Sequence, residues 1–165
     1  MPYFDQYIAL STSSDIETTL VESHNHLVQV IQPLTEEEMN FAYAESKWNI
    51  KELVQHLIDT ERIFVYRALR FARNDKTELP GYDHDNYNDE SNAKFKTKEQ
   101  LLKEFVAVHR ATIMFFNQLP DEAMERMGTA SNEKLSVSSI AHIIAGHTQH
   151  HLSVIEERYL PKLLL

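Results

Sequence analysis

The sequence predicts an all-α protein, a four-helix bundle with a long connection between its second and third helices. Four long segments carry apolar residues at the spacing of an amphipathic helix, and no strand-like alternation bounded by turns is evident. Glycine is scarce, with 3 in 165 residues. A chain of this length can bury one full core, so we expect residues 1–165 to form a single domain.

The first two helices are predicted from their apolar stripes and from the residues at their starts. The first covers residues 15–32, with Ser14 as the candidate N-cap. The second covers residues 49–74 and opens with Asn49, followed three residues later by Glu52, which is the pattern of a capping box. Its inner face carries Leu53, His56, Leu57, Thr60, Ile63, Phe64 and Arg67.

The third and fourth helices follow the same logic. The third covers residues 97–119 and opens with a second box pattern, formed by Thr97 and Gln100. The fourth runs from about residue 136 to residue 159 or 160, and Pro161 is expected to end it. One side of the fourth helix carries Ile140, Ile143, Ile144, His147, His151, Val154, Ile155 and Arg158.

The segment from Asp75 to Lys96 is the long connection, and it is polar and acidic with interspersed tyrosines. A structureless loop of about twenty residues is uncommon inside a compact domain, so we interpret it as a lid or as a long crossover. A crossover would let the second and third helices run parallel. Residues 121–135 are expected to form one short helical turn and then a polar loop.

Charge and composition exclude several functional classes. The 16 Lys and Arg residues against 25 Asp and Glu residues give a net charge of −9, which opposes binding to nucleic acid or to acidic membrane surfaces. The absence of cysteine rules out thiolate metal sites and cysteine nucleophiles, and it fits a cytoplasmic location. The three glycines form none of the phosphate-binding or serine-hydrolase motifs. Neither a signal peptide nor a membrane span is evident.

Nine histidines are the unusual feature of the composition. His147 and His151 are four residues apart, so on a helix their rings project from one face and can chelate one metal ion. His56 lies on the inner face of the second helix. If the two helices are antiparallel neighbours, the three rings lie at matching depth. The pattern predicts a metal site at His56, His147 and His151, and hydrogen-bonded core histidines are the alternative.

Three neutral nitrogen ligands suit zinc, nickel or ferrous iron better than calcium or magnesium. Three protein ligands also leave a coordination position open for water or substrate, which is typical of catalytic sites. An ion held there can acidify a bound water or thiol, or polarise a carbonyl. We therefore expect a divalent metal cofactor, zinc or nickel first and iron as a further option.

The other inward histidines, His24, His109 and His142, are expected to be hydrogen-bonded core residues. His150 points away from the proposed ligands, and we expect it behind them or on the surface. Other metal motifs are missing. The sequence has no H-E-x-x-H motif of zinc peptidases, and residues 83–94 lack the glycine and the final acidic residue of an EF-hand loop.

Three further residues near His56 have both a structural and a functional interpretation. Asp59 is expected to be a solvated helix carboxylate, with orientation of a metal-bound imidazole as the alternative. For Arg67 we expect an internal ion pair or a head group that reaches solvent, with binding of an anionic substrate group as the alternative. Trp48 is expected to be a hydrophobic staple or a core plug before the second helix.

Two stretches of the chain match a known pattern. Residues 47–62, K-W-N-I-K-E-L-V-Q-H-L-I-D-T-E-R, place a tryptophan eight residues before a histidine. Residues 140–151, I-A-H-I-I-A-G-H-T-Q-H-H, end in a double histidine. Together with Tyr66-Arg67 and Ala72-Arg73, and over nearly the whole chain, they resemble the DinB/YfiT-like superfamily of metalloenzymes.

The resemblance implies a DinB-like four-helix bundle whose metal is held by one histidine of the second helix and two of the fourth. Carried over, these ligands are His56, His147 and His151. The superfamily includes bacillithiol transferases and mycothiol-dependent maleylpyruvate isomerases, whose thiol belongs to a small-molecule cosubstrate. The resemblance thus implies a thiol S-transferase or a hydrolase acting on a small molecule, with a low-molecular-weight thiol as a candidate partner. A homodimer is a further expectation.

Two other functional classes remain open from the sequence. A non-enzymatic metal or small-ligand binding module would have its metal site closed by a fourth side chain, for which His24, His109, His142 or His150 are the candidates. A purely structural bundle with buried histidines would bind no stoichiometric metal.

Overall fold

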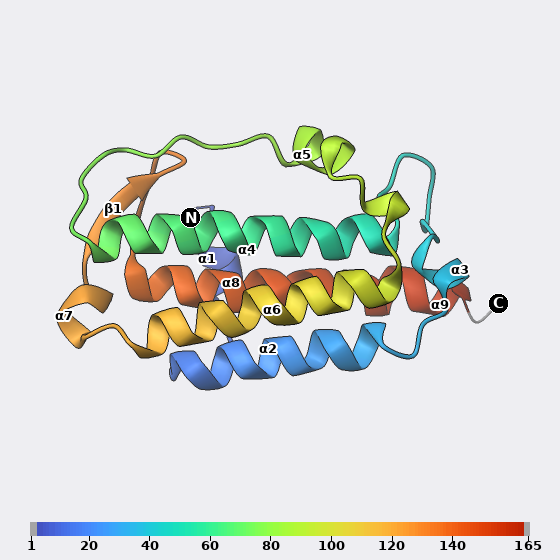
Figure 1. Cartoon of the computed structure of the whole chain (residues 1–165), viewed down its shortest axis with the longest axis horizontal. Coiled ribbons are helices and arrows are strands. Elements are labelled where there is room, and N and C mark those ends of the chain that lie inside the picture. The colour runs from blue at the N-terminus through green and yellow to red at the C-terminus, as the bar shows by residue number, and fades with distance from the viewer. Residues whose placement is uncertain (1–2, 164–165) are drawn as a thin grey trace.

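Four long helices packed side by side form the body of the protein, in a computed structural model that describes residues 3–163 (Figure 1). The predicted all-α four-helix bundle is confirmed. The helices are α2 (Ile16–Ile31), α4 (Ile50–Ala72), α6 (Lys98–Asn117) and α8 (Val137–Val154). Within the described range, no helix is both long enough and apolar enough to cross a membrane.

The directions of the four helices follow from the long connection. α4 and α6 run parallel, and α2 and α8 run the opposite way (Figure 1). Both α4 and α2 pack against α6 and α8. Residues 75–96 carry the chain back along the bundle from the end of α4 to the start of α6, so the predicted crossover is confirmed. α4 and α8 are therefore antiparallel neighbours, as the three-histidine prediction requires.

Capping boxes begin three of the long helices. At α4, the Asn49 side chain accepts the Glu52 N–H at 2.9 Å, and the Glu52 carboxylate accepts the Asn49 N–H at 2.8 Å. Thr97 and Gln100 form the second predicted box at α6. Ser136 caps α8. These bonds satisfy backbone N–H groups that have no partner inside their own helix.

Two predicted helix ends are wrong. Asp15, not Ser14, caps α2, because the Asp15 carboxylate accepts a backbone N–H of the first turn at 2.8 Å. Pro161 does not end the fourth helix, because the chain continues through a π-helical turn, η2 (Ile155–Tyr159), into α9 (Leu160–Leu163). Proline is tolerated in the first turn of a helix, where N–H groups have no partner within that helix.

A β-hairpin replaces the polar loop predicted before the fourth helix. The antiparallel strands β1 (Met127–Ala130) and β2 (Glu133–Ser136) are joined by Ser131 and Asn132. These two residues have φ values of 52° and 63°, the left-handed conformation that a two-residue type I′ turn requires. The expectation that the chain has no strands is wrong, because four-residue strands are too short to show a clear alternation.

Short elements complete the described chain. They are α1 (Asp5–Ile8), α3 (Glu36–Met39), α5 (His84–Glu90), η1 (Ala93–Phe95) and α7 (Asp121–Met124). α7 is the helical turn predicted after the third helix. The crossover is not structureless, because it contains α5 and η1 and is tied to the hairpin. The Leu79 N–H donates to the Thr129 carbonyl at 3.0 Å, and the Leu79 carbonyl accepts the Ser131 N–H at 3.1 Å.

The interior of the bundle holds two apolar clusters with a polar level between them. One cluster lies toward the hairpin and includes Phe71 and Ile140, and the other lies toward α3 and includes Leu27 and Tyr159. Buried polar side chains gather between the two clusters. They are His56, Thr60, Glu61, His109, Thr112, His147 and Thr148. This level of the bundle carries the candidate site.

Gly146 allows α1 to rest on bare backbone of α8. A Cβ atom at Gly146 would lie 1.7 Å from the Tyr7 carbonyl oxygen. We expect Gly146→Ala to lower the free energy of unfolding by about 2 kcal/mol, because overpacking outweighs the better helix propensity of alanine. Gly81→Ala is the matched control, since a Cβ atom at Gly81 would lie 3.4 Å from its nearest neighbour, the Ser131 hydroxyl oxygen. Urea denaturation measures both variants, and equal stabilities would contradict the close approach of α1.

Candidate metal centre

Three histidine rings converge between α4 and α8. His56 projects from α4, while His147 and His151 project from consecutive turns of α8. The Nε2 atom of His147 lies 3.2 Å from Nε2 of His56 and 3.1 Å from Nε2 of His151. The three candidate ligand atoms all lie within 4.8 Å of one another. The structure thus brings together the three histidines that the sequence singled out.

Helix geometry explains why these side chains meet. His56 lies about two turns after the start of α4, and His151 lies about one turn before the end of α8. Because the helices are antiparallel, these two positions come to similar depth. The spacing of four residues then places His147 on the same face of α8, one turn away from His151.

Burial keeps the three imidazoles neutral. His56 is 9% exposed and His147 is 8% exposed. Burial lowers the pKa of His56 to about 4 and the pKa of His151 to about 3, and neighbouring histidines add to both effects. The same causes hold the pKa of His147 well below its usual value. A neutral imidazole has the lone pair that a metal ligand needs.

The second ring nitrogen of His56 has a partner of its own. Nδ1 of His56 lies 3.4 Å from the Thr60 hydroxyl, which lies 2.8 Å from the hydroxyl of Tyr82. When Nδ1 donates to Thr60, the lone pair of the ring is on Nε2 and faces the other two histidines. Thr60 therefore favours the tautomer that metal binding requires, and it links the ring to the crossover.

The donor set fits a divalent transition metal. Among the described residues, this is the one group of three or more His, Asp or Glu side chains whose ligand atoms converge in this way. Three imidazole nitrogens with no carboxylate suit zinc, nickel or ferrous iron. They also leave coordination positions for water or a substrate, because a pocket lies beside them.

The pocket has a volume of about 410 Å³, within the range of small-molecule sites. Beyond α4 and α8, its walls come from the segment around α1, from the crossover and from the hairpin. These wall residues are Tyr3, Phe4, Tyr7, Tyr82, His84, Ser131 and Glu133. No pattern in the sequence marks these residues as part of the site, because they lie in short elements with no helical periodicity and reach the site only through tertiary packing.

The crossover also packs against the site. Tyr82 bonds to Thr60 above the site, and the ring centroid of His84 lies 5.9 Å from that of His56. Trp48 closes the adjacent side, with its ring centroid 4.9 Å from that of His56. Trp48 thus lines the pocket rather than plugging the core. The long connection is therefore a crossover that also lines the pocket, and its action as a lid stays a prediction.

The other histidines do not join the three. His109 is a satisfied core residue, as predicted, with Nδ1 2.9 Å from a Glu61 carboxylate oxygen and Nε2 2.9 Å from a backbone carbonyl oxygen. The ring of His24 stacks on His109 at 5.0 Å. Nδ1 of His142 lies 2.8 Å from a serine hydroxyl near the start of α2. His150 lies beside His151 and lines the pocket outside the ligand group.

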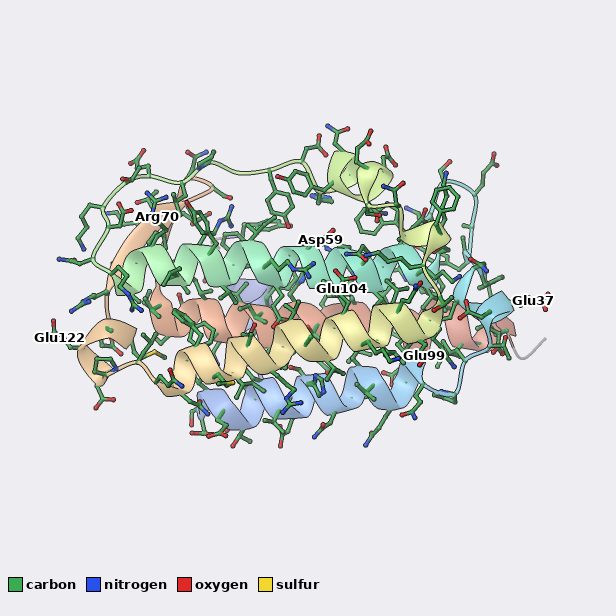
Figure 2. All side chains as sticks on the ribbon, viewed as in Figure 1. Glu37, Asp59, Arg70, Glu99, Glu104 and Glu122 are labelled. Atoms are coloured by element: carbon green, nitrogen blue, oxygen red, sulfur yellow. The ribbon has the colours of Figure 1, made fainter. Side chains whose placement is uncertain are left out.

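Asp59 does not orient an imidazole, so the functional alternative for this residue is wrong. Its carboxylate accepts a bond from the Gln55 amide at 2.9 Å. Arg62 bridges it to Glu104 on α6, and both acidic residues lie along the junction of α4 and α6 (Figure 2). Asp59 belongs to a surface charge network between these two helices.

Arg67 contradicts both structural expectations. It is 3% exposed, so its head group does not reach bulk solvent, and within residues 3–163 no carboxylate pairs with it. Its Nη2 atom donates to the Pro80 carbonyl at 3.1 Å and to the Ser131 hydroxyl at 2.8 Å. The side chain lines the pocket that holds the three histidines.

The depressed pKa values predict how acid affects the metal-free protein. Between pH 6.5 and about 4 the unfolded chain binds more protons at His56, His147 and His151 than the folded chain does. The free energy of unfolding should therefore fall on acidification through this window, by at least about 1 kcal/mol per pH unit. His151→Gln should show a shallower slope in chemical denaturation. Identical slopes would contradict the buried, neutral state of this ring.

Comparisons with known proteins identify the family of the chain and match its fold. A sequence profile of the DinB superfamily matches residues 19–155. OB0413 from Oceanobacillus iheyensis, provisionally named a metal-dependent hydrolase, is 25% identical over 136 residues, which cover 80% of this chain and 76% of that protein. YfiT from Bacillus subtilis is described as a probable metal-dependent hydrolase with an unusual four-helix bundle topology. It superposes with a TM-score of 0.73 at 19% sequence identity, over 93% of this chain and 84% of that chain. Because the profile spans most of the chain and all three site histidines, the chain belongs to the DinB superfamily.

Proposed function

We propose that this chain is a metal-dependent hydrolase of small molecules, in which His56, His147 and His151 hold a divalent ion. Zinc or nickel is the first choice, and ferrous iron also fits three imidazoles. The observation that carries the proposal is the convergence of three neutral Nε2 atoms beside an open pocket. The descriptions of OB0413 and YfiT support the choice of hydrolysis.

A divalent ion held in this way lowers the pKa of a bound water or thiol and polarises a carbonyl oxygen. In hydrolysis of an ester or amide, the oxygen of water bonds to the carbonyl carbon, the bond to the alcohol or amine breaks, and the leaving group takes up the proton. The three rings must stay neutral for this chemistry, and their burial favours the neutral form.

The open side of the histidine cluster favours an enzyme over a closed binding module. A closed module needs a fourth side-chain ligand, and the four histidines considered for that role lie outside the cluster. His24 and His109 stack in the core, His142 bonds to a serine, and His150 lies beside the ligands. The structure describes no other carboxylate or imidazole that converges on the three Nε2 atoms.

The walls of the pocket suit the handling of a small organic substrate. Trp48 and Tyr82 line the pocket with the histidines and offer aromatic surface to an organic group. Thr60 bonds to Tyr82 and contacts His56, so it holds the ring of His56 in place.

Thiol S-transfer is the second candidate. The resemblance to thiol-dependent members of the family favours it, and a chain without cysteine would take the thiol as a low-molecular-weight cosubstrate. The same three histidines and the same pocket would serve this reaction. The two candidates differ in whether turnover needs an added thiol.

Turnover of ester and amide panels by the zinc-loaded or nickel-loaded protein tests the proposal. We expect hydrolysis without added thiol, and a loss of at least about 100-fold in kcat/KM for His147→Ala, because a ligand is removed. His26→Ala is the matched control, since His26 lies on α2 outside the histidine cluster, with its Nε2 atom 2.9 Å from a Glu156 carboxylate oxygen.

Two results would overturn the hydrolase proposal. One is the absence of hydrolysis with zinc, nickel or iron. The other is turnover of electrophiles only when a low-molecular-weight thiol is added, which would identify thiol transfer as the reaction.

A further inference from the structure

We propose that Arg67 forms a carboxylate-binding subsite of the pocket, so that the substrate is a small molecule that carries a carboxylate apart from the bond to be hydrolysed. The assignment of a substrate rests on the proposed function. The subsite itself rests on the surroundings of Arg67 and can be tested without turnover.

Arg67 shares a pocket with the three histidines. Arg67 follows His56 by eleven residues, or about three turns, on the same face of α4. Thr60 and Phe64 lie between them on this face, and all four side chains line the pocket. A ligand held by Arg67 therefore lies along the wall that leads to the three histidines.

The guanidinium of Arg67 is buried, stays charged and has no ionic partner among the described residues. Arg62, Arg70 and Arg126 each pair with a carboxylate. Arg67, by contrast, has no carboxylate oxygen within 4.0 Å among residues 3–163, and its Cζ atom lies 5.2 Å from the centre of the Phe64 ring. A buried cation that faces a cavity and lacks a counter-ion favours binding of an anion.

Arg67 also keeps hydrogen-bond donors free for a ligand. The two hydrogen bonds of Arg67 both start from Nη2. They tie the crossover and the hairpin to α4, which is a structural role. The N–H groups of Nη1 and Nε have no acceptor in the described chain. The structural role thus leaves three of the five donors of the guanidinium for a ligand.

Charge balance favours a carboxylate over a phosphate. Apart from the histidines, Arg67 is the one basic residue among those that line the pocket, and Glu133 is the one acidic residue. The single guanidinium balances one negative charge on a ligand, and the Glu133 carboxylate repels a second negative charge on that ligand. A singly charged carboxylate fits this balance better than a phosphate dianion does.

Binding to the full chain, with and without zinc, tests the subsite. The probes are glutarate monomethyl ester, its neutral dimethyl ester and a phosphate monoester of matched length, titrated by NMR or calorimetry. We expect the monomethyl ester to bind about tenfold tighter than the dimethyl ester, with or without zinc. Arg67→Met should remove this preference, and Arg67→Lys should restore part of it.

Two further variants keep the test decisive if Arg67→Met folds poorly. Arg73→Met removes an exposed arginine from the end of α4 and should leave the preference unchanged. Glu133→Gln removes the repelling charge and should tighten binding of the monomethyl ester about threefold, without any change at Arg67.

The outcomes separate the subsite from the proposed function. Equal affinity for the two esters would overturn the subsite, even if the zinc-loaded protein hydrolyses the dimethyl ester and so supports the hydrolase. Preference for the carboxylate that depends on Arg67, in a protein that hydrolyses nothing, would support the subsite and overturn the hydrolase. Tighter binding of the phosphate through Arg67 would overturn the assignment to carboxylates.

Discussion

The antiparallel contact between α4 and α8 is the constraint on which the site depends. It sets His56 and His151 at the same depth in the bundle. Moving one of these histidines by a single position in the sequence would turn its ring by about 100° around the helix axis, away from the other two. Apolar clusters on both sides of this level help to bury the rings, and burial holds them neutral. The three Nε2 atoms lie within 4.8 Å of one another with no carboxylate among them, which supports the proposal of a metal ion at this point.

The peripheral segments turn this contact into a pocket. A bare pair of helices would expose the three rings to solvent, and the crossover, the hairpin and α1 build walls around them. Their positions are linked, since Leu79 pairs with the hairpin and Arg67 bonds to both segments. Gly146 lets α1 lie directly on α8 beside His147. The polar side chains of the walls therefore come from segments that also hold one another in place.

The features that follow the periodicity of a helix could be predicted from the sequence. Apolar periodicity and capping boxes located the four long helices, and the spacing of His147 and His151 located the candidate site. The hairpin was missed, because Ser131 and Asn132 adopt left-handed conformations without the glycine that usually marks such turns. Tyr82 and His84 were missed as pocket residues for another reason. Their places depend on how the crossover packs, and no local pattern encodes that packing.

The proposed chemistry of this site depends on the binding of one metal ion per chain. Elemental analysis of tag-free protein tests it most directly, with wild type, His151→Ala and His150→Ala measured side by side. We predict about one zinc, nickel or iron per chain in the wild type and in His150→Ala, and a large loss of metal in His151→Ala, because only His151 belongs to the convergent group. Wild-type protein without stoichiometric metal, and with the same melting temperature in added metal and in chelator, would contradict the account.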